Sequence, residues 1–182
     1  MPKIIDNLRN RILDSAERHL SEKGYHGLTI REIADECGIA SGTVYNYFNS
    51  KEMLVATIIG NSWIETLDKT DTAICDKGTV REGLLCIFDG LESFCLLYMN
   101  LWKDYGKTGS ENVLNPQRHS WLVDALSQRV ANVLEETGYE SEYKICQLIA
   151  EIMLSFATQG KQFRDYEAEL ERIIRKKSPA LT

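Results

Sequence analysis

The chain has 182 residues, of which 43% are hydrophobic and 26% charged, and its formal net charge is −6. This composition is typical of a folded globular protein and argues against a largely disordered chain. The negative charge excludes a protein that coats nucleic acid through bulk positive charge. Residues 1–60 carry seven Lys and Arg against eight Asp and Glu, so that any DNA binding there must come from a few placed cations.

The amino terminus, MPKIIDNLRNRILDSAERHL, has charges throughout and lacks the uninterrupted apolar segment of a signal peptide. The most apolar stretch, residues 84–101, is interrupted by Asp89, Glu92 and Asn100, which makes it too polar to span a membrane. We therefore expect a cytoplasmic protein with no membrane partner. Five cysteines are scattered among apolar residues, a pattern of reduced and packed thiols, at positions 37, 75, 86, 95 and 146.

The first third of the chain predicts two helices separated by a turn. Ile5, Leu8, Ile12, Ala16 and Leu20 recur at three- and four-residue steps, the stripe of an amphipathic helix. We expect Gly24 to end this helix in the left-handed conformation. Thr29 and Glu32 then have the spacing of a capping box, which opens a second helix that ends at Gly38.

The middle of the chain predicts a short helix followed by two long ones. The short helix runs from about Ser41 to Tyr47, and the segment at residues 49–52, NSKE, has the cap and early acid of a new helix. Thr79 and Glu82 repeat the capping-box spacing and open a helix that runs to about Lys103. Because this helix is apolar on nearly every side, we expect it to be central.

The remaining segments are also helical. Residues 106–112 read as a loop, and Asn115 followed by Pro116 is a cap with proline at the first helical position. The helix that they open is expected to run to residue 136, with Gly138 beyond its end. Two further helices are expected at residues 141–159 and 166–177. No segment shows the alternation of a strand, so the predicted fold class is all-α.

The spacing from Ile30 to Val44 is that of two short helices crossing at a steep angle. Ala34 allows the helices to approach, Gly38 turns the chain with a positive φ, Ile39 fills the turn and Val44 anchors the second helix. An ordinary helical corner uses the same kinds of residue. A DNA-binding helix-turn-helix is the alternative, in which the second helix enters the major groove.

The residues left outside this corner favour DNA binding. With Val44 and Phe48 turned inward, the short helix exposes hydroxyl, amide and phenol groups, which suit base edges and phosphate oxygens. We expect one of the two tyrosine rings in this helix to pack on the first helix, leaving only its hydroxyl exposed. The exposed residues are Ser41, Thr43, Tyr45, Asn46 and Tyr47.

The segment at residues 24–54, GYHGLTIREIADECGIASGTVYNYFNSKEML, resembles the TetR family of bacterial transcriptional regulators. The resemblance implies an amino-terminal helix-turn-helix domain, placed at 1–50, and a helical ligand-binding and dimerisation domain at 51–182. It further implies a homodimeric repressor that a small hydrophobic effector releases from a palindromic operator, with no cofactor, catalytic residue or metal. Positions that commonly contact DNA in the family are Thr29, Arg31, Ser41, Gly42, Thr43, Tyr45, Asn46, Tyr47 and Lys51.

Two positions depart from the family pattern. Many relatives have serine where Ala40 stands and lysine where Ser41 stands. The first change removes the usual hydroxyl cap of the short helix, and we expect Ser41 to replace it through a one-residue shift. The second removes a cation that binds phosphate, which should flatten the dependence of affinity on salt.

The larger half is rich in aromatic and sulfur-containing residues on apolar helical faces. A plain hydrophobic core is one interpretation, and a pocket for a planar or hydrophobic effector is the other. The helices near the carboxyl end carry apolar residues beyond one stripe, which suits a two-fold partner. The pocket candidates are Trp63, Phe88, Phe94, Tyr98, Trp102, Trp121, Met153 and Phe156.

Two other functions compete with that of a DNA-binding regulator. An enzyme has little support, because His19, His26 and His119 lie far apart and no phosphate loop, catalytic triad or metal spacing is present. The second alternative is a TetR-like fold used as a protein-interaction module or a non-repressor coregulator. The weakly charged amino-terminal segment and the missing lysine are the reasons to consider it.

Overall fold

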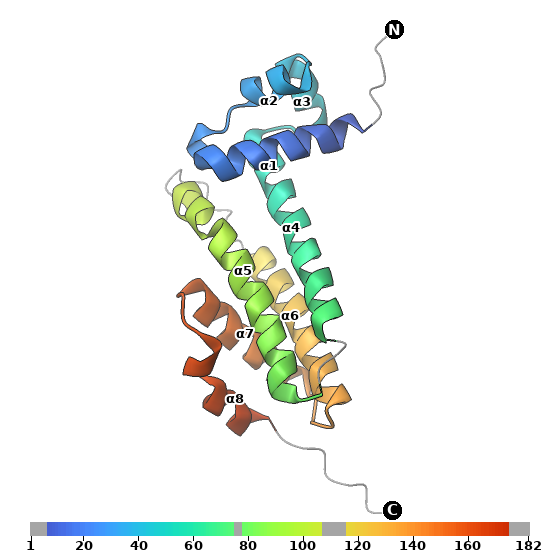
Figure 1. Ribbon diagram of the computed structural model, residues 1–182, viewed down its shortest axis with the longest axis vertical. Helices are drawn as coiled ribbons and strands as arrows, with labels where there is room; N and C mark the ends of the chain where they lie inside the picture. The colour runs from blue at the N-terminus through green and yellow to red at the C-terminus, as the bar shows by residue number, and fades with distance from the viewer. Residues whose placement is uncertain (1–6, 75–77, 107–115, 175–182) are drawn as a thin grey trace, which may run out of the picture. The chain divides into compact units, whose positions relative to one another are not determined.

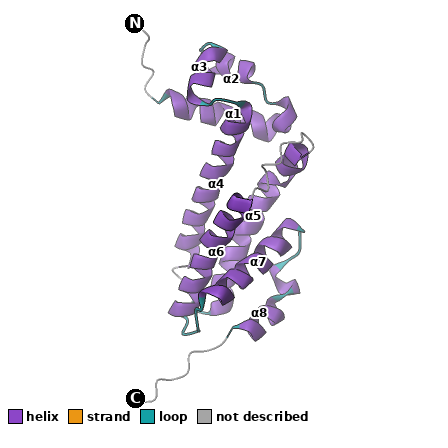
Figure 2. Cartoon of the chain, turned by 180° about the vertical axis from the view of Figure 1, so that it is seen from behind, coloured by secondary structure: helices purple, strands orange, loops and turns teal. Residues whose placement is uncertain are grey.

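The computed structural model describes residues 7–74, 78–106 and 116–174, with the side chains of residues 99–118 outside the description. These residues form helices and no strand (Figures 1 and 2), which confirms the all-α prediction. The elements are α1 (Leu8–Gly27), α2 (Ile30–Cys37), α3 (Ser41–Tyr47), α4 (Lys51–Ile74), α5 (Val80–Gly106), α6 (Pro116–Glu136), α7 (Tyr143–Thr158), η1 (Phe163–Asp165) and α8 (Glu167–Ile173). Ile5, Cys75, the predicted loop from residue 107 and the predicted helix end at 175–177 lie outside the described residues.

The chain divides into two compact units. The first comprises Met1–Ile64 and Asn100–Gly109, and the second Glu65–Met99 and Ser110–Thr182. Because α4 and α5 are continuous helices, each contributes residues to both units. The functional boundary expected at residue 50 stays a prediction.

The core of the first unit lies among α1, α2 and α3. Ile12, Ala16, Ile33 and Val44 are each no more than 1% exposed, and they alternate with exposed residues at helical spacing. Figure 1 shows α2 and α3 lying across α1, with α2 packed against both α1 and α3. Burial of an isoleucine or valine side chain contributes about 1.5–3 kcal/mol relative to exposure. The predicted apolar stripes are therefore the faces that hold this unit together.

Gly24 interrupts the first helix, as predicted, with a positive φ of 69° and a non-helical ψ of −179°. Beyond this kink a further helical turn continues to Gly27. The extra turn exists because Tyr25 and Leu28 are both buried and anchor the chain beyond the kink. Sequence periodicity missed this turn because its anchors depend on contacts with other helices.

In the second unit, α5 buries one broad stripe, which runs from Leu84 through Phe88 and Leu91 to Cys95. Its opposite side is open, with Leu96 65% and Leu97 58% exposed. The expectation of a helix enclosed on all sides was wrong. A helix that packs along one face exposes the side chains of its opposite face, even where these are apolar.

Helices α6 and α7 pack against each other in the second unit. Gly138 ends α6 with a φ of 81°, as its position predicts, and Tyr139 donates its backbone N–H to the carbonyl of Leu134 at 2.7 Å. Two side-chain pairs bridge the helices. The Tyr143 hydroxyl donates to Asp124 at 2.7 Å, and His119 meets Glu151 at 3.0 Å.

No helix in the described part of the chain is long and apolar enough to cross a bilayer. The described cysteines are free thiols, with Cys37, Cys95 and Cys146 buried and Cys86 half-buried. Burial raises the pKa of Cys95 to about 11, which keeps this thiol protonated at neutral pH.

Candidate nucleic-acid interface

The turn between α2 and α3 aims the second of these helices. Gly38 has a φ of 67°, and its N–H donates to the carbonyl of Asp35 at 3.1 Å. Ile39 donates to the carbonyl of Ala34 at 2.9 Å, which completes a Schellman motif. Val44, at 0% exposed, then fixes α3 against the core. The helix-turn-helix spacing predicted from the sequence is present as a structure.

Thr29 caps α2 from its first turn. Its hydroxyl oxygen accepts a hydrogen bond from the backbone N–H of Glu32 at 3.3 Å and donates to the Glu32 carboxylate at 2.9 Å. Thr29 and Glu32 therefore form the predicted cap. The Glu32 carboxylate accepts from the Thr29 hydroxyl, however, and not from the Thr29 backbone N–H as in a capping box. Thr29 itself remains exposed beside Arg31.

The cap of α3, and not its start, differs from the expectation. The helix begins at Ser41, with Ala40 in the cap position and no side-chain hydrogen bond to the first turn. The expected shift of the cap to Ser41 was therefore wrong. Ala40 has no side-chain oxygen, so the first turn of α3 has no side-chain cap.

The outer face of α3 carries the predicted polar groups. Gly42 and Asn46 are exposed, and nothing lies within 4 Å of the position a Cβ would occupy on Gly42. Tyr45 is 48% and Tyr47 is 45% exposed. Neither ring is buried on the first helix, so the expectation for one of them was wrong. Both phenols are available to a partner, together with the half-buried Ser41 and Thr43.

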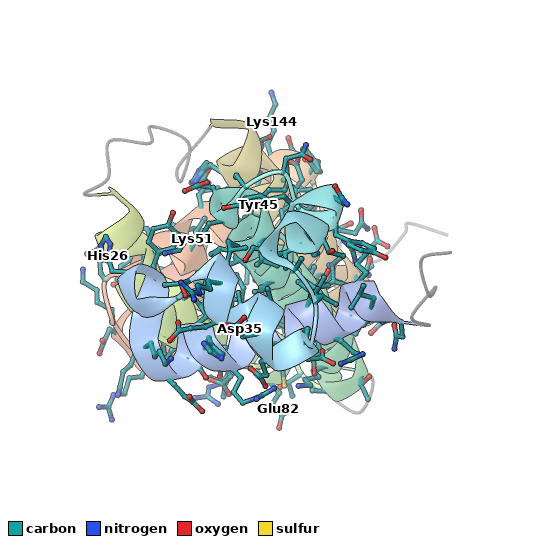
Figure 3. All side chains as sticks on the ribbon, turned by 90° about the horizontal axis from the view of Figure 1, so that it is seen from above. His26, Asp35, Tyr45, Lys51, Glu82 and Lys144 are labelled. Carbon is teal, nitrogen blue, oxygen red and sulfur yellow. The ribbon has the colours of Figure 1, made fainter. Side chains whose placement is uncertain are left out.

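Lys51 is held beside α3 by the first turn of α4. Its Nζ lies 4.3 Å from the centre of the Tyr25 ring, and Tyr25 donates its hydroxyl to Glu52 at 2.8 Å. Figure 3 labels Lys51 and Tyr45 in the view onto this unit. Partial burial lowers the pKa of Lys51 from its usual value. A cation so fixed is suited to a phosphate, because its position is defined before binding.

Two arginines of α1 and α2 add further cations to this unit. Arg31 is exposed at the start of α2 and lies 3.9 Å from Asp35. Arg9, which sequence reasoning missed, lies with its guanidinium 5.2 Å from the centre of the Phe48 ring. The sequence shows a cation at the start of the first helix. It does not show that this cation contacts Phe48, which is 39 positions away.

Carboxylates of α2 are neutralised on the side of α1. Glu36 accepts hydrogen bonds from Ser15, Arg18 and His19, and these hold the pKa of Glu36 at about 2, with Ser15 the largest cause. Glu32 pairs with Lys23 at 2.8 Å. The carboxylates of Glu32 and Glu36 are thus paired with side chains of α1. A unit with nearly balanced charge can therefore present cations on a different face.

Comparison with known proteins agrees with this geometry. Residues 12–58 match the family model for bacterial regulatory proteins of the tetR family. The uncharacterized HTH-type transcriptional regulator YvdT of Bacillus subtilis is 30% identical over 157 residues, which cover 79% of this chain and 77% of that protein. The chain belongs to the TetR family. It is a DNA-binding transcriptional regulator.

Two further proteins resemble this TetR-family chain over at least 90% of its length. The HTH-type transcriptional repressor KstR of Mycobacterium tuberculosis is 27% identical over 175 residues, 92% of this chain and 79% of that protein. The regulator FadR from Bacillus subtilis, solved in complex with stearoyl-CoA, has a TM-score of 0.57 at 19% identity, covering 90% of this chain and 91% of that one. The second likeness shows a shared TetR fold.

The effector-pocket candidates of this TetR-family chain occupy different environments. Trp121 is 47% exposed on α6, Phe156 is half-buried, and Trp102 lies outside the described side chains. Trp63 belongs to the first unit. The buried candidates are Trp63, Phe88, Phe94, Tyr98 and Met153.

Ring contacts connect some of these candidates in the second unit. Phe94 lies 5.0 Å from Tyr98, centre to centre. Phe88 and Phe156 both contact Tyr166, at 5.5 Å and 4.4 Å. Tyr166 was absent from the sequence-based set because it directly precedes a short charged helix. The structure thus joins two predicted pocket residues through a third that the periodicity did not indicate.

Proposed function

We propose that this TetR-family regulator is a homodimeric repressor that binds an inverted-repeat operator and leaves it when a small hydrophobic effector binds the second unit. The observation that carries the proposal is the division of α3 into a buried face, Val44 with Phe48 behind it, and a polar face. That division aims Thr43, Tyr45 and Asn46 away from the core. The names of the relatives support repression and a ligand of apolar character.

The exposed groups suggest distinct roles at the DNA. Asn46 and the half-buried Thr43 carry amide, hydroxyl and methyl groups, which read base edges in the major groove. Tyr47 and Lys51 suit phosphate oxygens, which fix the register of the helix on the duplex. Gly42 leaves the backbone uncovered and allows a close approach to the groove.

A second copy of the chain is proposed to pack on α7. Ile145 and Ile152 are half-buried and Leu148 is 47% exposed, and their spacing of three and four residues places them on one face. Trp121 on α6 is also 47% exposed. The hydrogen bonds His119–Glu151 and Tyr143–Asp124 join α6 and α7 on either side of this surface. Trp121 lies between His119 and Asp124 in sequence, and Leu148 lies between Tyr143 and Glu151. A two-fold dimer would set two reading helices about 34–36 Å apart.

Footprinting on the DNA upstream of the chain's own and neighbouring genes tests the DNA proposal. We expect a protected inverted repeat, with protection lost in Thr43→Ala and Tyr47→Ala. Thr72→Ala is the matched control, because Thr72 is an exposed threonine of α4 in the second unit. A protein that folds but protects no palindrome, at any concentration up to micromolar, would contradict the proposal and favour a protein-interaction module.

Sedimentation velocity tests the dimer separately. We expect a concentration-dependent dimer that Leu148→Glu converts to a monomer, because a carboxylate would be desolvated at the interface. Leu97→Glu is the control, since Leu97 is 58% exposed on α5 and lies outside the proposed surface. A strict monomer at micromolar concentration would refute the dimer.

A further inference from the structure

Four aromatic rings form a cluster where η1 and α8 meet α5 and α7. We call Phe88, Phe156, Phe163 and Tyr166 the ring cluster. Tyr166 lies at its centre, with its ring 4.4 Å from Phe156 and 5.5 Å from both Phe88 and Phe163, centre to centre. All four residues belong to the second unit.

The hydroxyl of Tyr166 is buried without a hydrogen-bond partner among the described residues. The residue is only 2% exposed. A buried hydroxyl left unpaired destabilises the folded protein, a cost that phenylalanine at this position would avoid. The hydroxyl therefore points to a polar atom that is supplied by a bound molecule.

Carboxylates flank the ring cluster. Glu92 lies one helical turn after Phe88 on α5 and is half-buried. Burial, and then the charges of Glu92, Asp165 and Asp89, raise the pKa of Tyr166, so these charges lie within electrostatic range of its hydroxyl. Asp165 already accepts a hydrogen bond from the backbone of Gln162 at 2.9 Å.

Neither Glu92 nor Asp89 has a cationic partner in the part of the chain that the structure describes. The ion pairs of this unit use other carboxylates, namely those of Glu65, Asp71, Glu151 and Glu167. Burial alone raises the pKa of Asp89, with no cation opposing it. The edge of the ring cluster thus has unneutralised negative charge.

One face of the ring cluster already contacts an ammonium group of the chain itself. Gly160 has a φ of 69° and turns the chain after α7, and Lys161 donates its backbone N–H to the carbonyl of Phe156 at 3.0 Å. This turn returns the Lys161 side chain over the Phe156 ring, with Nζ 4.4 Å from the ring centre. Because Lys161 is exposed and Phe156 half-buried, this edge of the cluster reaches the surface.

We propose that the ring cluster, Glu92 and the Tyr166 hydroxyl bind an organic cation, an amine with an apolar aromatic or alkyl body. The ammonium donates hydrogen bonds to Glu92 and to the Tyr166 oxygen, and the rings of Phe88 and Phe156 contact the body. Lys161 occupies part of this position until the ligand displaces it. The inference rests on the proposed ligand-responsive function and specifies the chemistry of its effector.

Charge decides among the possible ligands. An anionic ligand would meet the negative charges of the half-buried Glu92 and the exposed Asp89, and like charges repel. A neutral ligand would satisfy the Tyr166 hydroxyl but leave Glu92 unpaired. A cation satisfies both groups and gains a cation–π contact with the rings.

Isothermal titration calorimetry on the full-length protein without DNA tests the proposal. The probes are phenethylammonium, 2-phenylethanol and phenylacetate, which share a body of similar size and differ in charge. We expect the cation to bind at least about ten-fold more tightly than the alcohol, and the acid to bind most weakly. Equal or tighter binding of the alcohol or the acid would overturn the proposal, as would the absence of binding by all three at millimolar concentration.

Three variants locate the site. Glu92→Gln should remove the preference for the cation over the alcohol, whereas Lys161→Gln should increase affinity for the cation by removing a competing ammonium. Tyr166→Phe should weaken binding of the cation and raise the thermal stability of the free protein, because it deletes an unpaired buried hydroxyl. A Tyr166→Phe protein that is less stable and binds the cation unchanged would refute the assignment.

These measurements are independent of DNA binding. If footprinting finds an operator and the cation does not bind, the regulator proposal stands and the effector class fails. If the cation binds as expected and no palindrome is protected, the ligand site stands and the operator proposal fails. Each proposal therefore has its own negative result.

Discussion

The hydroxyl of Tyr25 donates a hydrogen bond of 2.8 Å to the carboxylate of Glu52, and this bond joins the last turn of α1 to the first turn of α4. The Tyr25 ring also supports the ammonium of Lys51. Tyr25→Phe keeps the ring and removes the bond, so we expect a loss of about 1 kcal/mol in the free energy of unfolding. DNA affinity should fall several-fold, because the ring that contacts Lys51 remains but its hydroxyl no longer anchors it to α4.

Urea unfolding and a DNA-binding titration measure the two effects of Tyr25→Phe. Tyr143→Phe is the control, since it removes a hydroxyl bond of 2.7 Å in the second unit. We expect the control to lower stability without a specific loss of DNA affinity. Unchanged stability and affinity in Tyr25→Phe would show that the Tyr25 bond does not position Lys51.

Gly42→Ala separates folding from DNA approach. Nothing lies within 4 Å of a Cβ at this position, and alanine favours a helix over glycine by up to about 1 kcal/mol. The variant should therefore be as stable as the parent or more so. Its affinity for DNA should fall, because the methyl group occupies the space between the α3 backbone and the groove. Thermal unfolding and a gel-shift titration give both numbers, and an unchanged affinity would contradict a close backbone approach.

Ser41→Lys should restore a phosphate contact at the start of α3. We expect tighter binding in low salt and a slope of log affinity against log salt that is steeper by about 0.9 per added contact. Ser21→Lys, at an exposed position on α1, controls for net charge. Equal affinity of variant and parent across the salt titration would refute the prediction.

The Glu36 cluster should make the first unit sensitive to acid. Hydrogen bonds from Ser15 and Arg18 hold the pKa of Glu36 at about 2, against an ordinary value of 4.5. A lowered pKa contributes stability that is complete above about pH 4.5 and is lost as pH falls toward 2. Thermal melts followed from pH 6 to pH 2 should show this loss. In Glu36→Gln the loss in that window should be smaller, and an identical profile would rule out the contribution of Glu36.

Two glycines in helices should respond to alanine in opposite directions. A Cβ on Gly83 would lie 2.6 Å from Cγ1 of Val133, a buried and branched side chain that cannot yield. We expect Gly83→Ala to destabilise the protein by about 1–3 kcal/mol. Gly60→Ala meets nothing within 4 Å and should stabilise α4 by about 0.5–1 kcal/mol. Differential scanning calorimetry of both variants tests the pair, and a stabilised Gly83→Ala would contradict the packing.

The sequence by itself determined the helices and the corner that aims α3. Thr29 bonds to Glu32, and the Gly38 turn is closed by hydrogen bonds to Asp35 and Ala34, so these local interactions allow the turn that leads into α3 to be predicted. The start of α3 was predicted correctly, even though its expected cap was not.

Only the tertiary structure decided which side chains from distant segments meet. The Tyr25 bond to Glu52 spans 27 positions, and Tyr166 contacts Phe88 from 78 positions away. Periodicity cannot predict such pairs, because it states which face of a helix is apolar and not which element will cover it. For the same reason Leu96 and Leu97 were expected inside and lie exposed. Helix caps are set by residues close in sequence. The ring cluster and the contact of Lys51 with the Tyr25 ring are formed by residues that are distant in sequence and that only the tertiary fold brings together.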